Sequence, residues 1–132
     1  MGPDTDKEFP LILIVEDNDF MKRILTDCLK GYSCVTAKTL KSAMELFEEH
    51  MPDIVFLDMA LPDGSGLDVV APMIEKKNKV SIFAVSGEDE KKMAGKATAL
   101  GVKAYISKPY SKAQIDACMK KFLSENYFGE LF

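Results

Sequence analysis

Acidic, hydroxyl and basic residues follow four apolar runs of the sequence, each at the point where a run ends. Glu16 and Asp17 come directly after "LILIV", and Asp58 comes after "IVFL". Ser86 follows "VSIFAV", and Lys108 follows "AYIS". Carboxylates that lie close together do not all stay ionised without a cation. If the runs are neighbouring strands, the sequence predicts one site with three carboxylates, a hydroxyl and an ammonium group.

This set of groups is suited to phosphoryl transfer. Hard oxygen ligands with open positions suit Mg²⁺, which takes one or two carboxylates and keeps several waters. A carboxylate can act as a nucleophile and form an aspartyl phosphate, and Asp58 is the candidate because it stands alone after a β-rich run. Mg²⁺ or Mn²⁺ would offset charge on the transferring group, while Lys108 would pair with it and Ser86 would donate a hydrogen bond.

The elements that must position these residues alternate along the chain. Short unbroken apolar runs predict strands that are covered on both faces, at Leu11–Val15, Tyr32–Ala37, Ile54–Leu57, Val80–Val85 and Val102–Ser107. Apolar residues with helical spacing lie between and after them. Strict alternation predicts an α/β fold, a doubly wound sheet of five parallel strands flanked by five helices. Ligands bind at the carboxyl ends of the strands in such sheets.

Several residues mark the ends of the expected helices. Asn18 and Asp19 favour a helix start over a role at the acidic site, because short polar side chains cap helices and acids suit the first turn. Thr39 and Ser111 are expected to cap the second and fifth helices. Pro72 interrupts the third helical pattern, which predicts a kink or a late helix start.

The composition excludes several classes of protein. A net charge of −4 gives no excess of basic residues for binding nucleic acid, so we expect no contact with nucleic acid. No apolar run approaches the roughly 20 residues of a membrane span, so we expect no membrane segment. Cys28, Cys34 and Cys118 are an odd number without C-x-x-C spacing, which argues against disulfides and zinc. We interpret them as small buried side chains in a reducing cytoplasm, and expect a cytoplasmic protein.

Four segments together resemble the receiver domain of two-component response regulators, the CheY-like family. They are "LILIVEDND", "DIVFLDMALPDGSGLD", "AVSG" and "AYISKPY". Each alone is weak, but all four in this order, each at an element end, are highly specific. The resemblance covers about residues 10–124, which we expect to form one receiver domain with strand order 2-1-3-4-5. Residues 1–9 would be a disordered leader, and residues 125–132 a tail or the start of a linker.

The resemblance implies a metal-binding role for the acidic residues. Asp17 and Asp58 would bind Mg²⁺ directly, Glu16 would bind it through water, and the backbone carbonyl of Ala60 would be a further ligand. Ala60 has no polar side chain to position a hydrolytic water, whereas Glu88 could do so.

The resemblance also implies a switch. Asp58 would be the phosphoacceptor and Lys108, joined to Pro109 by a cis bond, would contact the phosphoryl group. Ser86 would be the switch hydroxyl and Tyr105 the aromatic switch, whose ring turns inward when Ser86 moves. The phosphoryl donor would be a phosphohistidine of a sensor histidine kinase or histidine phosphotransfer protein. The face formed by the fourth helix, fifth strand and fifth helix would then change partners.

Two other functions compete with this interpretation. The fold could serve only as a constitutive docking module, although the complete set of acids, hydroxyl and lysine argues against that. An aspartyl-nucleophile phosphatase of the haloacid-dehalogenase type would need a second catalytic aspartate two residues after Asp58, where Ala60 stands. We therefore expect a signalling phosphoacceptor that catalyses only its own phosphorylation and dephosphorylation, rather than an enzyme with an external substrate.

Overall fold

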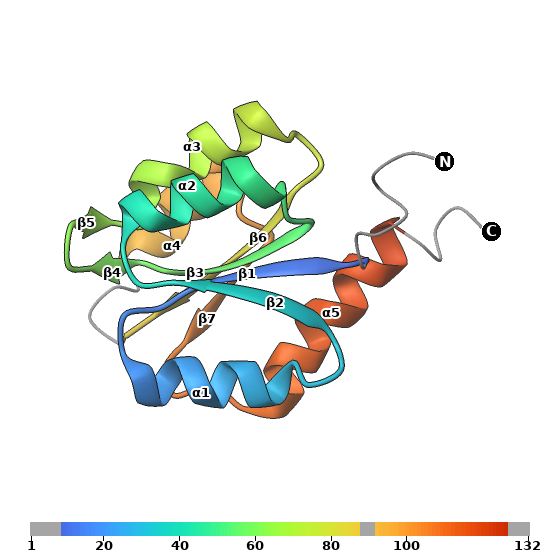
Figure 1. Ribbon diagram of the computed structural model, residues 1–132. Coiled ribbons are helices and arrows are strands. Elements are labelled where there is room, and N and C mark those ends of the chain that lie inside the picture. Colours follow the sequence, from blue (N-terminus) through green and yellow to red (C-terminus); the bar gives the residue numbers. More distant parts are fainter. Residues whose placement is uncertain (1–8, 88–91, 127–132) are drawn as a thin grey trace.

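Five parallel strands form one central sheet within residues 9–87 and 92–126, which the computed structural model describes (Figure 1). They are β1 (Leu11–Val15), β2 (Ser33–Ala37), β3 (Ile54–Asp58), β6 (Ser81–Ser86) and β7 (Ala104–Ser107). Their spatial order is β2-β1-β3-β6-β7. Because β4 (Ala60–Leu61) and β5 (Gly64–Ser65) form a separate small hairpin, this is the predicted order 2-1-3-4-5, and the predicted fold class is confirmed.

Helices of the described chain cover both faces of the sheet (Figure 1). One face is covered by α1 (Asp19–Cys28) and α5 (Lys112–Asn126). The other face is covered by α2 (Leu40–His50), α3 (Leu67–Lys76) and α4 (Ala94–Leu100). This two-sided cover explains why the strand sequences are continuously apolar rather than alternating.

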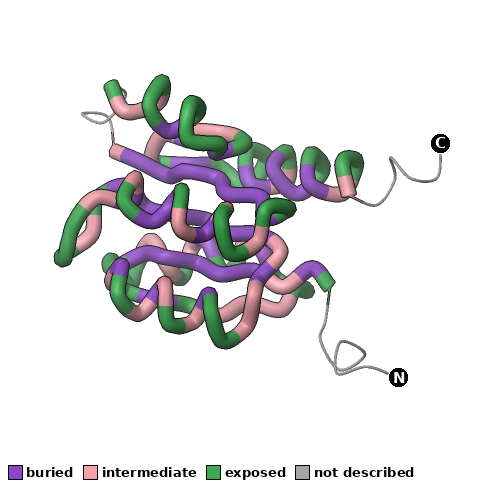
Figure 2. Tube along the Cα trace, turned by 90° about the horizontal axis from the view of Figure 1, so that it is seen from above, coloured by how far each residue is buried: buried purple, intermediate pink, exposed green. Residues whose placement is uncertain are grey.

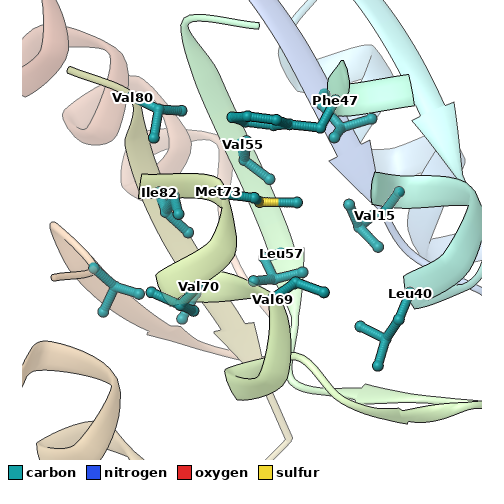
Figure 3. Packing of buried hydrophobic residues seen from close by; sticks show 14 of the residues in the cluster. Val15, Leu40, Phe47, Val55, Leu57, Val69, Val70, Met73, Val80 and Ile82 are labelled. Carbon is teal, nitrogen blue, oxygen red and sulfur yellow. The ribbon is translucent and has the colours of Figure 1, made fainter. Parts of the chain in front are cut away.

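The core divides into two layers, one on each face of the sheet. Val55 and Leu57 of β3 lie toward α2 and α3, where they pack with Phe47 and Met73 (Figure 3). Phe56, between them in sequence, belongs to the opposite layer, as the period of two in a strand requires. The three inner strands, β1, β3 and β6, are buried along most of their length, while the helices expose their outer faces (Figure 2). The sheet is therefore a rigid support for whatever its ends carry.

Local sequence signals explain where the helices begin. Asn18 caps α1, its side chain accepting a hydrogen bond from the backbone N–H of Met21 at 2.9 Å. Thr39 and Ser42 form a reciprocal capping box at α2. Ser111 at α5 was also predicted correctly, since its N–H donates to Gln114 and its hydroxyl accepts from the Gln114 N–H.

Of the two alternatives predicted for the third helix the late start is excluded, and the expectation of three buried cysteines was wrong. The helix α3 begins at Leu67, well before Pro72, so it has no late start. Burial of Val70 and Met73 against the sheet outweighs the one backbone hydrogen bond that proline removes. Of the cysteines, only one is buried; the other two are half-buried because Cys34 lies on the edge strand β2 and Cys28 ends α1.

The expected leader and tail fall largely outside the described residues, which exclude 1–8 and 127–132. Phe9 is described, and its ring lies 5.6 Å from that of Phe122 in α5. The helix α5 continues to Asn126. Among the described residues, none of the helices combines the length and the apolar character that crossing a membrane requires.

Candidate functional site

The carboxyl ends of the strands bring the predicted residues together. In the parallel register Val15 lies beside Leu57, Asp58 beside Val85, and Ser86 beside Ser107. Glu16 and Asp17 follow β1 and Lys108 follows β7, while Asp58 and Ser86 are the last residues of β3 and β6. We call this end of the sheet, at residues 15–17, 58, 86 and 107–108, the carboxyl edge.

One lysine joins two buried carboxylates at the carboxyl edge. The Nζ atom of Lys108 lies 2.8 Å from Oε1 of Glu16 and 2.9 Å from Oδ2 of Asp58. Glu16 is only 2% exposed and Asp58 only 4%. Their second oxygens also have partners, because Oδ1 of Asp58 accepts from the Ala60 N–H at 3.0 Å and Oε2 of Glu16 accepts from the Asn18 N–H at 3.1 Å.

A third carboxylate leaves the charges unbalanced. Glu16, Asp17 and Asp58 each offer one oxygen, and these three atoms lie within 4.8 Å of one another. Asp17 is exposed, and within the part of the chain that the structure describes no ion pair to it is present. Three carboxylates therefore share one ammonium group. This donor set fits a hard divalent cation that keeps some of its waters.

The pKa values at the site reflect the same imbalance. Burial raises the pKa of Glu16 to about 7, with Asp58 contributing in the same direction and Lys108 opposing. Burial alone would lower the pKa of Lys108, but its bonds to Glu16 and Asp58 outweigh that effect and raise it. Without a cation, Glu16 therefore binds a proton near neutral pH while Lys108 stays charged.

The two predicted switch residues lie on the neighbouring strands β6 and β7. Ser86 is fully buried, and its hydroxyl donates to the Gly87 carbonyl at 3.2 Å. Tyr105 is half-buried in β7, beside Ala84, and packs against the layer of core that α2, α3 and α4 cover. The Lys108–Pro109 bond is cis, as expected from the resemblance. Glu88 lies outside the described residues.

A small hairpin that leaves the site was not expected from the sequence. The stretch "PDGSG" contains residues typical of a turn, and in the structure β4 pairs with β5 in an antiparallel register that places Ala60 opposite Ser65. The N–H of Gly66 donates to the Met59 carbonyl at 2.9 Å. A side chain on Gly66 would collide with the backbone oxygen of Asp58, which explains a glycine there.

Two further residues beside the site were also missed. Tyr110 is buried, and its hydroxyl donates to the Met21 carbonyl of α1 at 2.9 Å. Burial raises the pKa of Tyr110, so it stays neutral as a donor. Phe20, in the first turn of α1, is 71% exposed although it is apolar. The spacing of apolar residues shows which of them share a helix face, but it does not show that a single apolar residue such as Phe20 is exposed.

Comparison with known proteins identifies the family. The model of the response regulator receiver domain matches residues 12–120. The chain belongs to this family. A curated relative, the polar-differentiation response regulator DivK of Brucella ovis, is 30% identical over 123 residues, which cover 86% of this chain and 96% of the relative. This chain is therefore the receiver domain of a two-component response regulator.

Solved structures of receiver domains share the fold. A response regulator receiver domain protein from Clostridium thermocellum superposes with a TM-score of 0.84 at 19% identity, covering 91% of this chain and 98% of that one. The receiver domain of NtrX from Brucella abortus gives a TM-score of 0.80 at 23% identity, covering 86% and 98%. As a signalling receiver domain, the chain has a histidine kinase or phosphotransfer protein as the implied class of partner.

Proposed function

We propose that this receiver domain accepts a phosphoryl group on Asp58 from a phosphohistidine, in a reaction that requires Mg²⁺ or Mn²⁺. The observation that carries the proposal is the environment of Asp58. Asp58 is nearly buried, and its Oδ2 lies 2.9 Å from Nζ of Lys108. One of its oxygens also lies within 4.8 Å of a carboxylate oxygen of Glu16 and one of Asp17. A purely structural ion pair does not need three carboxylates around one lysine.

The transfer moves one phosphoryl group between two side chains. A carboxylate oxygen of Asp58 attacks the phosphorus, and an oxygen–phosphorus bond forms. The phosphorus–nitrogen bond to the donor histidine breaks, and the imidazole keeps the electron pair and takes up a proton. Lys108 is close enough to Asp58 to pair with the oxygens of the transferring group, which is electrostatic stabilisation at the point where charge collects.

The proposed cation ligands follow from which oxygens are engaged. Asp17, Asp58 and the carbonyl of exposed Ala60 would hold the cation directly. Both oxygens of Glu16 already bond to Lys108 and to the Asn18 N–H, which supports a contact through water. When bound, Mg²⁺ offsets negative charge on the transferring group.

The proposed response is a change in the face formed by α4, β7 and α5. Phosphorylation adds about −1.5 to −2 charges at the end of β3. Ser86 would turn toward the new group, and Tyr105 would move inward in the layer that it already contacts. Tyr105 lies on β7, which is part of that face, and Ser86 lies on β6, the strand paired with β7. These positions support the assignment.

The proposal limits turnover to the domain's own phosphoryl group. An external phosphatase activity would need a general acid at position 60, and the alanine there offers only a methyl group. A constitutive docking module would not need a cation, so binding of Mg²⁺ separates it from a phosphoacceptor.

Asp58→Asn tests the proposal directly. The wild-type chain is incubated with acetyl phosphate and Mg²⁺, and its intact mass is measured with and without a chelator. We expect one added phosphoryl group that depends on Mg²⁺ and is absent in Asp58→Asn. Asp53→Asn, at the opposite edge of the sheet, is the matched control and should be labelled as the wild type is. Equal labelling of Asp58→Asn would contradict the proposal.

Exposed Phe20 is the proposed contact for the phosphohistidine donor, because it stands in the first turn of α1 beside the site. Phe20→Ala should slow transfer from a phosphorylated histidine protein while leaving labelling by acetyl phosphate unchanged, since the small donor needs no docking surface. A parallel loss with both donors would instead indicate damage to the site.

A further inference from the structure

The β4–β5 hairpin lies beside the start of α2 (Figure 1), and the side chain of Asp63 joins the two. Its Oδ1 accepts from the Leu40 N–H at 2.8 Å, and its Oδ2 accepts from the Lys41 N–H at 3.1 Å. These are the first two amides of the helix, which have no partner inside it. The Leu40 amide, with that of Lys41, holds the pKa of Asp63 below its usual range, so the side chain is a carboxylate.

The helix α2 already has a cap of its own. Thr39 accepts from the N–H of Ser42 at 3.0 Å, and Ser42 bonds back to the Thr39 N–H at 3.2 Å. Asp63 lies 23 residues away in the sequence from Leu40 and serves different amides. Its bonds therefore do more than end a helix, because they fasten a distant hairpin to it.

The hairpin is held at its base and at its tip. At the base, the Met59 N–H donates to the Val85 carbonyl at 3.1 Å, and the Gly66 N–H closes the loop. At the tip, Gly64 has a φ of +146°, and a side chain there would lie 3.0 Å from Cδ1 of Leu40. Asp63 supplies the polar tether at this tip. Ala60 lies between the two anchors.

We propose that Asp63 is a positioning residue that acts through the hairpin to fix the carbonyl of Ala60 for the divalent cation. The inference rests on the proposed function, in which that carbonyl is a cation ligand. Ala60 is exposed at the first position of a strand of only two residues, so its own pairing holds it weakly. Fixing the tip of so short a hairpin restricts the base as well.

Asp63→Ala tests this inference against Thr39→Ala as a matched control. Both substitutions remove caps from the same end of α2, but only Asp63→Ala cuts the link to the hairpin. Mg²⁺ affinity is measured by calorimetry, and amide hydrogen exchange at residues 60–65 is measured in metal-free protein. We expect Asp63→Ala to weaken Mg²⁺ binding by about 10-fold, as the loss of a residue that orients a metal ligand typically does. The same substitution should speed amide exchange in the hairpin. Thr39→Ala should change neither.

The outcomes separate this inference from the proposed function. If Asp63→Ala binds Mg²⁺ as the wild type does, or if Thr39→Ala weakens binding equally, the positioning role is wrong while the phosphoacceptor site stands. If the wild-type chain binds no Mg²⁺, the proposed function is wrong, and the cation-positioning role of Asp63 is overturned with it. Asp63→Asn, which keeps one acceptor oxygen, should give an intermediate affinity.

Discussion

The two edges of the sheet each carry an aspartate bonded to a lysine at the same distance. At the carboxyl edge Asp58 lies 2.9 Å from Lys108, and at the amino edge, where the strands begin, Asp53 lies 2.9 Å from Lys77. The two pairs differ in the number of further charged groups around them. Two further acids surround the first pair, whereas the second pair is complete.

The pair at the amino edge has a structural purpose. Oδ2 of Asp53 accepts from the Leu11 N–H at 2.8 Å, and Lys77 also donates to the Met51 carbonyl at 2.8 Å. These bonds tie the start of β1 to the residues around β3 and α3. One acid meets one ammonium group, and both also bond to the backbone, so no charge is left for a ligand to satisfy.

A hollow at the amino edge is distinct from the candidate site. A cavity of about 530 Å³ lies at the amino edge and includes Asp53, Lys77 and Phe122 among its lining residues. The acidic cluster lies at the other end of the strands. In this domain the sum of the charges, rather than the size of a hollow, distinguishes the site from the scaffold.

The largest expected contrast is in phosphorylation. Lys108→Ala should slow labelling by acetyl phosphate by about 100-fold or more, because it removes the cation that pairs with the transferring group. Lys77→Ala removes the lysine of the amino-edge pair and should leave the rate within a factor of about two. Initial rates from intact mass would show both effects. Equal slowing would mean that the two pairs do not differ as described.

The next contrast is in the free energy of unfolding, which a substitution at the amino edge should lower and a substitution at the carboxyl edge should raise. Asp53→Ala removes two acceptors from a satisfied pair and should lower the free energy of unfolding by about 2 kcal/mol. Asp17→Asn relieves repulsion among three acids and should raise it by about 0.5 kcal/mol in metal-free buffer. Urea unfolding measures both.

Added Mg²⁺ should stabilise the wild type more than Asp17→Asn. Binding to the folded state should stabilise the wild type by about 2.7 kcal/mol at a concentration 100 times the dissociation constant. Asp17→Asn should gain much less at the same concentration, since it lacks a ligand. A gain equal to that of the wild type would contradict the place of Asp17 in the site.

A further contrast is a pH dependence that belongs to the carboxyl edge. The pKa of Glu16 rises from 4.5 to about 7, so between these values the folded chain binds a proton that the unfolded chain has released. Stability from this group is therefore full below pH 4.5 and is lost as pH rises through about 7. Urea unfolding of metal-free protein should show this decline, and Glu16→Gln should reduce it. A slope unchanged by Glu16→Gln would contradict the assignment.

Much of the fold and the site could be predicted from the sequence because both depend on local patterns. Continuous apolar runs indicated strands buried on both faces, and a parallel sheet brings the residues after such strands to one edge. This is why Glu16, Asp17, Asp58 and Lys108 were expected together, and the structure places them together.

What could not be predicted depends on contacts between segments distant in sequence. The tether from Asp63 to α2 spans 23 residues, and no local pattern shows which helix a turn will meet. The bond from Tyr110 to the Met21 carbonyl spans 89 residues.

A Mg²⁺ titration followed residue by residue in two-dimensional ¹H–¹⁵N NMR spectra shows whether the carboxyl edge is a cation site. We expect saturable shifts at the amides of Asp17, Met59 and Ala60, with those of Asp53 and Lys77 unmoved. Asp58→Asn should weaken the titration. If Mg²⁺ causes no saturable change at the carboxyl edge, or if it shifts the amino edge equally, the unbalanced charges of the carboxyl edge do not form a cation site.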